Sequence, residues 1–230
     1  MFNVYINGNI SFKGRNSKSV SVEDLKISLA GIPFNINGAV KYGNGSLQTD
    51  NLVAKIEEFP LEEFIKYIPK AIVPQKEKVN TNARLSVEAN IYGTYNAVTG
   101  ELPYADIAVN IPNSYIGFQG RKEKIKDLHL NATYHFRGDN ADSNLVRIEK
   151  FGIDGDGIMV SGKGAVADLM GDPYINMQMK GYLNLDSAVQ MLPAGSDLFA
   201  QGTVDASMEI KSRLSNLTPY NLANTNLKGS

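Results

Sequence analysis

The chain has 230 residues, of which 43% are hydrophobic, and a formal net charge of -1. This size suffices for one large domain or two small ones, and the near-neutral charge argues against the basic surface typical of nucleic-acid binding. The absence of cysteine excludes disulfides and a thiol nucleophile. The sequence contains no run of about 18 apolar residues that would predict a membrane helix.

Both ends of the chain alternate apolar and polar residues like strands. The first residues lack the basic segment and apolar stretch of a secretory leader. We therefore expect the chain to be a piece of a longer protein, with any targeting segment lost upstream.

Strict alternation predicts a strand around Leu25, Ile27 and Leu29, which share one side of an extended chain. The turn sequence Gly43-Asn44-Gly45 then predicts a tight connection. Residues 60–69 have a different spacing, with apolar positions at i, i+3, i+4 and i+7 between two prolines. This spacing predicts a short amphipathic helix.

The alternation then resumes and continues through most of the remaining chain, with about a dozen strands in total. The Asp-Gly repeat at 154–157 and the Gly-Asp-Pro at 171–173 predict turns between these strands. A second short helix is predicted near 186–193, with Asp186 as N-cap and Pro193 as terminator. The apolar side of the later strands carries Leu85, Val87, Ile91, Leu128, Leu130, Ile175, Met177, Met179, Leu183, Val204, Met208 and Ile210.

Two stretches of the chain echo one another. Gly38-Ala39-Val40 precedes the first predicted helix, and Gly164-Ala165-Val166 precedes the second. After each helix come a loop and a one-sided strand. We interpret residues 1–100 and 101–230 as two β-rich repeats, joined near Gly100 and Pro103. Repeats of this kind usually stack edge to edge into an elongated body.

Candidate chemistry is sparse. His129 and His135 lie on one predicted strand but about 20 Å apart at roughly 3.3 Å per residue, so we expect surface residues and no joint metal site. The segment 154–157 lacks the third oxygen ligand and closing glutamate of a calcium loop. The glutamate pairs Glu57-Glu58 and Glu62-Glu63 fit a solvated helix face better than general acid–base chemistry. We therefore expect no enzyme, no metal and no cofactor.

The apolar side of the strands leaves two architectures open. Taken alone, the alternation favours a closed β-sandwich, whose core these residues would fill. A curved sheet with an apolar concave face open to lipid chains gives the same alternation.

The second repeat resembles the AsmA family of bacterial envelope proteins, which is related to TamB and to eukaryotic bridge-like lipid-transfer proteins. The resemblance rests on the unit GIMVSGKGAVADLMGDPYINMQMKGYLNLDSAVQMLP followed by FAQGTVDASMEI. Its markers are the phrase Gly181-Tyr182-Leu183-Asn184-Leu185, the terminator Leu192-Pro193 and the reopening Gly202-Thr203-Val204. The first repeat matches more loosely, because Ile68-Pro69 stands where Leu-Pro is expected and the glycine before Leu85 is missing.

The resemblance implies a periplasmic body, an inner-membrane anchor upstream of this chain, and a groove of strands that shelters acyl chains. We accordingly predict a mainly β fold: an elongated, curved antiparallel sheet or open sandwich of two repeats, with short amphipathic helices near 60–69 and 186–193. The expected partners are a phospholipid or another acyl-chain lipid and the remaining segments of the full-length protein, with no nucleic acid.

The predicted groove is lined by the apolar residues named above, and its flexible methionines would accept varied chains. The alternative function is a structural or carbohydrate-binding β-sandwich of the cell surface. In that case Tyr174 and Tyr182, which share the polar side of one strand, would stack on sugar rings.

Overall fold

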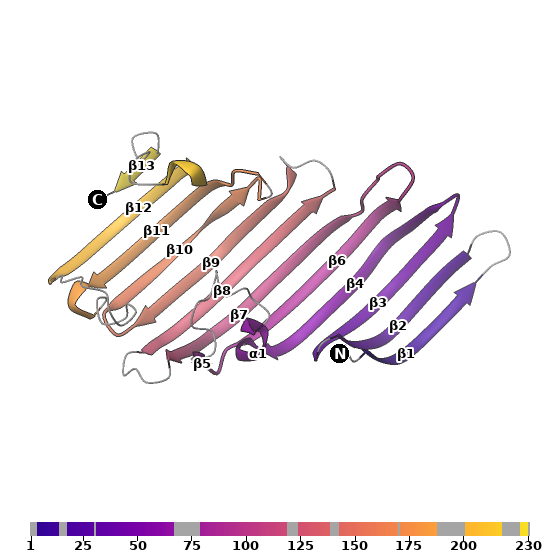
Figure 1. Ribbon diagram of the computed structural model, residues 1–230, viewed down its shortest axis with the longest axis horizontal. Helices are drawn as coiled ribbons and strands as arrows, with labels where there is room; N and C mark the ends of the chain where they lie inside the picture. The colour runs from indigo at the N-terminus through magenta and orange to yellow at the C-terminus, as the bar shows by residue number, and fades with distance from the viewer. Residues whose placement is uncertain are drawn as a thin grey trace.

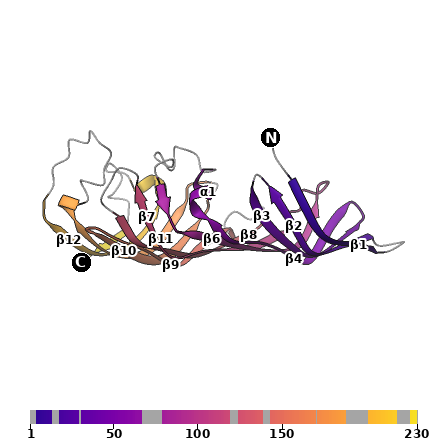
Figure 2. The same cartoon turned by 90° about the horizontal axis from the view of Figure 1, so that it is seen from below.

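The protein is mainly β and consists of one open antiparallel sheet, as predicted (Figure 1). The computed structural model describes residues 4–13, 18–29, 31–66, 79–118, 124–138, 143–169, 171–187, 201–217 and 226–229. Figure 2 shows that the sheet is curved, with the short helix α1 on its concave side.

The strands follow the predicted alternation closely. They are β1 (Val4–Lys13), β2 (Lys18–Leu29), β3 (Ile32–Gly43), β4 (Ser46–Pro60), β5 (Val79–Thr81), β6 (Arg84–Asn96), β7 (Tyr104–Phe118), β8 (Lys124–Arg137), β9 (Leu145–Gly155), β10 (Ile158–Ala167), β11 (Tyr174–Asn184), β12 (Thr203–Arg213) and β13 (Asn226–Gly229). Short helical elements accompany the strands in the described part of the chain, among them α1 (Leu61–Ile65) and the 3-10 turn η3 (Leu214–Asn216).

Strand order in the sheet is the order in the chain. Each of the twelve strands on this path pairs with its neighbour in sequence, and only β5 lies off the path, where it pairs with β7. The pairings between the described strands are all antiparallel, so the sheet runs in successive antiparallel strands from β1 at one end to β13 at the other (Figure 1). This arrangement keeps contacts between neighbours and produces an elongated body.

The predicted junction between the repeats lies inside this sheet. The strands on its two sides, β6 and β7, pair directly, so the sheet continues across residues 100–103. The echoed glycines share one structural feature: an added Cβ would lie 2.3 Å from the Asn51 carbonyl oxygen at Gly38 and 2.3 Å from that of Asn176 at Gly164. In each repeat one strand, β4 or β11, follows the strand that carries the echoed glycine and leads into the helical turn. The boundaries of the two repeats stay a prediction.

Turn chemistry explains the tight hairpins. Asn44 and Gly45 connect β3 to β4 with φ values of 51° and 75°, which is the left-handed conformation that such two-residue turns require. Residues 154–157 likewise form the end of β9 and the turn that leads into β10, with Gly157 at φ 82°. The hairpin interpretation of this segment is confirmed.

The first predicted helix is confirmed, and it packs on the sheet. Leu61 and Ile65 of α1 are both buried, in a cluster with Val79, Ala83, Leu85 and Ile111. Five residues are too few for a helix that is stable alone, so its stability comes from this packing. The predicted end at Ile68 and Pro69 lies outside the described residues.

The second predicted helix starts earlier than expected. Leu185–Ser187 form a helical turn, and residues 188–193 lie outside the described residues. The cap is Asn184, whose Oδ1 accepts a hydrogen bond of 3.0 Å from the Ser187 amide. The prediction of Asp186 as N-cap was therefore wrong. Its carboxylate accepts instead from the Gly202 amide, 3.3 Å away, and joins this turn to the start of β12.

The closed β-sandwich favoured by alternation alone is not found. The described strands belong to one sheet, with no second sheet among them to cover its apolar face. Within the described residues, no large side chain is less than 2% exposed. A sandwich interior would contain several such side chains, so this molecule has an apolar layer that is only partly shielded.

Candidate functional site

Directly paired residues of antiparallel strands have their side chains on the same face, so the register shows which residues line up across the sheet. One row crosses ten strands, from β2 to β12. It consists of Leu25, Ile36, Ala54, Ala89, Ile107, Tyr134, Val146, Val166, Ile175 and Ser212. Nine spacings of about 4.8 Å make this row about 43 Å long.

A second row runs beside the first on the same face. Its members are Ile56, Val87, Val109, Ala132, Ile148, Gly164, Met177 and Ile210. A third row contains Leu130, Phe151, Gly162, Met179 and Met208. We call the face formed by these rows the apolar face, and the opposite one the polar face. Because α1 packs on Leu85 and Ile111, the apolar face is the concave one (Figure 2).

All fifteen residues predicted to line a groove lie on described strands, and the sheet brings them to this face. Three are buried: Leu25, Leu85 and Met177. Two near the ends of strands are exposed, Leu29 at 48% and Val204 at 44%. The other ten are partly exposed: Ile27, Val87, Ile91, Leu128, Leu130, Ile175, Met179, Leu183, Met208 and Ile210.

The helix α1 covers only part of the apolar face. Partly buried Phe64, Val87, Val109, Leu128 and Leu130 pack around its cluster, so this cover lies over β6, β7 and β8. The cluster does not extend to the apolar residues of β10, β11 and β12. The middle of the apolar face is therefore shielded. At its β10–β12 end the face carries Met177, Met179 and Met208, and we call this part the methionine-rich surface.

Strand β10 contributes two residues without side chains, Gly162 and Gly164, to the rows of the apolar face. Larger side chains of the neighbouring strands cover both glycines. A Cβ at Gly162 would lie 2.7 Å from Cε1 of Phe151, and one at Gly164 would lie 2.5 Å from Sδ of Met177. Phe151 and Met177 thus occupy the space that side chains of β10 would otherwise fill.

Sequence reasoning missed the contribution of β9. Val146 and Ile148 lie on the apolar face, and so do Phe151 and Ile153, although the parity changes between the two pairs. The register shift that causes this lies at Glu149 and Lys150, where two residues face one on the neighbouring strand. The sequence did contain a signal: the apolar residues of this strand change from even to odd positions on the two sides of the charged pair Glu149-Lys150.

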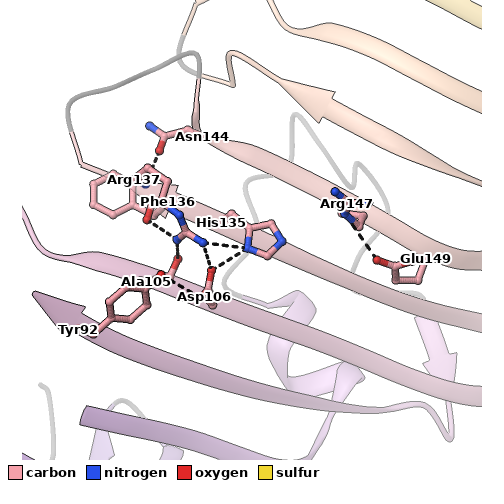
Figure 3. A network of polar contacts seen from close by, with 9 residues as sticks. All are labelled: Tyr92, Ala105, Asp106, His135, Phe136, Arg137, Asn144, Arg147 and Glu149. Atoms are coloured by element: carbon pink, nitrogen blue, oxygen red, sulfur yellow. Dashed lines mark hydrogen bonds and ion pairs between the residues drawn. The ribbon is translucent and has the colours of Figure 1, made fainter. Parts of the chain in front are cut away.

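The polar face carries a compact cluster on β6, β7 and β8 (Figure 3). Asp106 lies at its centre: one carboxylate oxygen contacts Nη2 of Arg137 at 2.6 Å and Nδ1 of His135 at 2.6 Å. The hydroxyl of Tyr92 donates to the other oxygen at 3.2 Å. The Arg137 guanidinium also lies 5.8 Å and 5.9 Å from the ring centres of Tyr92 and Tyr104.

These contacts set the ionisation of the cluster. Burial alone would raise the pKa of Asp106, but hydrogen bonds from His135 and Arg137 together with the arginine charge hold it below its ordinary value. Burial and the neighbouring Asp106 charge raise the pKa of Tyr92. Asp106 is therefore ionised and surrounded by hydrogen-bond donors. The cluster joins β6, β7 and β8 to one another.

The substitution Asp106→Asn should lower the free energy of unfolding more near neutral pH than at acidic pH. A lowered folded-state pKa means that the ionised carboxylate stabilises the fold above its unfolded-state pKa, and that this stabilisation disappears as the pH falls through the folded-state value. Urea denaturation at pH 7 and pH 3 should show a larger difference between wild type and Asp106→Asn at pH 7. The exposed pair Lys41–Asp50 provides the control Asp50→Asn, which should change little at either pH. Equal losses for Asp106→Asn at both pH values would contradict this role.

The two histidines are partly buried, with side-chain exposures of 16% for His129 and 29% for His135, whereas we expected freely exposed surface residues. His135 belongs to the cluster, and His129 lies against Gly152, with its Nδ1 3.2 Å from Asp127 and its Nε2 buried. Sequence spacing alone could not show the cross-strand partner of His135, which is Asp106 on β7. Among the residues that the structure describes, no group of three or more acidic or histidine side chains could hold a metal ion.

The two tyrosines that the carbohydrate-binding hypothesis proposes as sugar contacts lie towards opposite ends of β11. Tyr174 and Tyr182 share the polar face but are eight residues apart, about 26 Å in a strand. Tyr174 is further engaged by the guanidinium of Arg213, 5.9 Å from its ring centre. One sugar ring therefore cannot contact both.

The described helices are all too short to cross a membrane. No protein-family model, curated protein or solved structure matches this chain.

Proposed function

We propose that this chain is a non-catalytic, lipid-handling module whose apolar face shelters acyl chains. The observation that carries the proposal is the partial exposure of an apolar surface that extends from β2 to β12 and is covered by α1 over β6, β7 and β8. Soluble monomers rarely expose continuous apolar patches larger than a few hundred Å², and larger patches mark sites for ligands, partners or membranes.

The apolar face suits a flexible chain better than a rigid ligand. It is a long surface lined by aliphatic and thioether side chains, with few polar groups that would fix one orientation. Burying an acyl chain stabilises it by about 0.8 kcal/mol for each methylene removed from water. Met177, Met179 and Met208 can adapt to chains of different shape, because methionine has several accessible rotamers and a polarisable sulfur.

The remaining elements fit the same role. The polar face carries charged pairs such as Lys55–Glu88, at 3.0 Å, which keep the outer surface hydrated. The helix α1 shields the middle of the apolar face, so a bound chain would lie at the methionine-rich end. Transfer of lipid between membranes needs shelter from water and no reactive group, so we propose no catalytic residues.

We further propose that this role belongs to the bacterial envelope, because the sequence resembles the AsmA pattern. We propose a periplasmic module of a longer protein, anchored to the inner membrane by a segment outside this chain, which serves phospholipid transport or maintenance of the outer membrane. The open sheet edges at β1 and β13 would continue into the remaining segments of that protein.

Lipid extraction from the purified protein tests the proposal. The protein should carry phospholipid, detected by mass spectrometry of an organic extract, in an amount approaching one molecule or more per chain. After delipidation it should take up a fluorescent fatty acid in proportion to protein concentration. A folded preparation that carries no lipid and takes up no probe would refute the proposal.

A further inference from the structure

An open, shallow cavity in the described part of the chain lies over β9–β12, away from the Asp106 cluster. Its volume is about 680 Å³. It is lined by Glu149, Lys150, Phe151, Ser161, Gly162, Lys163, Gln178, Met179, Lys180, Ser207, Met208 and Glu209. Nothing in the proposed lipid role uses its polar residues.

The register places the polar lining residues in two adjacent rows. Ser161, Lys180 and Ser207 are directly paired, and so are Lys163, Gln178 and Glu209. These residues alternate with Met179 and Met208, so their side chains lie on the polar face. The cavity therefore combines two rows of donors, and the sheet itself separates those donors from the apolar rows.

Three lysines of this cavity have no ion-pair partner among the described residues. They are Lys150, Lys163 and Lys180. The two acidic lining residues are already engaged by cations outside the lining: Glu209 with Lys211 at 2.6 Å, and Glu149 with Arg147 at 3.8 Å. The cavity thus has a surplus of positive charge.

The lysines are also held close together by the strands. Lys163 lies between the pairs Gly162–Phe151 and Gly164–Ile148, and therefore faces the register shift at Glu149 and Lys150. Lys180 is diagonal to Lys163 across β10 and β11, about 7–8 Å away at the backbone. Like charges on facing strands destabilise a sheet, and a bound anion would reverse that effect.

We propose that this cavity binds a phosphate group carried by a small ligand. Three ammonium groups supply the charge, since lysine binds phosphate as a compact point charge. The hydroxyls of Ser161 and Ser207 and the amide of Gln178 supply neutral donors to the remaining phosphate oxygens or to ligand hydroxyls. The donors of this site lie on the polar face, opposite the side chains that would contact an acyl chain, although Phe151, Met179 and Met208 also border the cavity.

Calorimetric titrations with inorganic phosphate, glycerol 3-phosphate and glucose 6-phosphate test the proposal at low ionic strength. Glycerol and glucose serve as uncharged controls. The wild-type protein should bind at least one phosphate compound, and the double variant Lys163→Gln/Lys180→Gln should bind it at least tenfold more weakly. The matched control Lys13→Gln/Lys26→Gln removes the same charge from β1 and β2 and should bind like wild type.

The three compounds separate the possible sources of the phosphate. Preference for glycerol 3-phosphate indicates a lipid head group, preference for glucose 6-phosphate a phosphorylated sugar, and equal binding of all three the free anion; each supports the site. Absence of binding by every compound, or equal weakening in both double variants, would overturn it. Fatty-acid uptake should be the same in both variants, so failure of this site is distinguishable from failure of the lipid proposal, and thermal melts verify folding.

Discussion

The substitution Met179→Glu is expected to reduce uptake of a fluorescent fatty acid at least tenfold while leaving the sheet folded. Met179 lies on the apolar face between Gly162 and Met208, and it is only partly buried. A carboxylate there would have to lose its hydration when a chain binds, which costs several kcal/mol without a partner. In the free protein it can stay hydrated, so the loss of binding should exceed the loss of stability.

Gln178→Glu is the matched control. It introduces the same charge one residue away, on the same strand, but on the polar face, where Gln178 is exposed. Uptake should stay within about twofold of wild type, a difference of less than about 0.5 kcal/mol. The pair is measured by fluorescence titration, with far-ultraviolet circular dichroism to verify the fold. Equal loss in both variants would mean that charge alone, and not the face, controls uptake.

Replacing Gly164 by valine is expected to destabilise the protein by about 3 kcal/mol, the upper part of the range for overpacked sites. The added Cβ would lie 2.3 Å from the carbonyl oxygen of Asn176 and 2.8 Å from Cα of Met177. Both atoms belong to the backbone of β11, so relief requires the strands to separate. The free energy of unfolding, from urea denaturation, measures this cost.

Gly43→Val provides the comparison. Gly43 lies at the end of β3, where an added Cβ meets no atom within 4 Å. Valine there should change the stability by less than about 0.5 kcal/mol, as is usual for surface positions. If both variants unfold at the same urea concentration as wild type, the close approach of β10 and β11 does not contribute to stability.

The strands were predictable because alternation is a local property. Residues 84–96 and 174–184 show it directly, and both form strands with those residues on one face. The turns at 43–46 and 154–157 were predictable for the same reason, since glycine and asparagine or aspartate in sequence specify a left-handed or tight conformation.

The choice between a sandwich and an open sheet could not be predicted from alternation. A strand that packs against a second sheet and a strand that faces a groove have the same pattern. What differs is the partner that covers the apolar side, and this depends on contacts between distant segments. Leu85 illustrates the point: it is 3% exposed because α1, Val79 and Ile111 pack on it, whereas Val204 has no such cover and is 44% exposed.

Cross-strand partners were also beyond sequence reasoning. Asp106 and His135 are 29 residues apart, and they meet because β7 and β8 pair in one register out of several possible ones. Register shifts hid other members of the candidate site: Phe151 lies on the apolar face only because two residues of β9 face one of β10. A strictly alternating pattern would have assigned it to the polar face.

Photo-crosslinking can show directly which face of the sheet contacts a bound acyl chain. A phospholipid with a diazirine in its acyl chain is bound to the purified protein, irradiated, and the labelled residues are mapped by mass spectrometry. If acyl chains bind the apolar face, labels are expected on Met177, Met179 and Met208, with their polar-face neighbours Gln178, Lys180 and Ser207 unlabelled. Labels distributed equally over the two sets, or confined to the polar set, would contradict it.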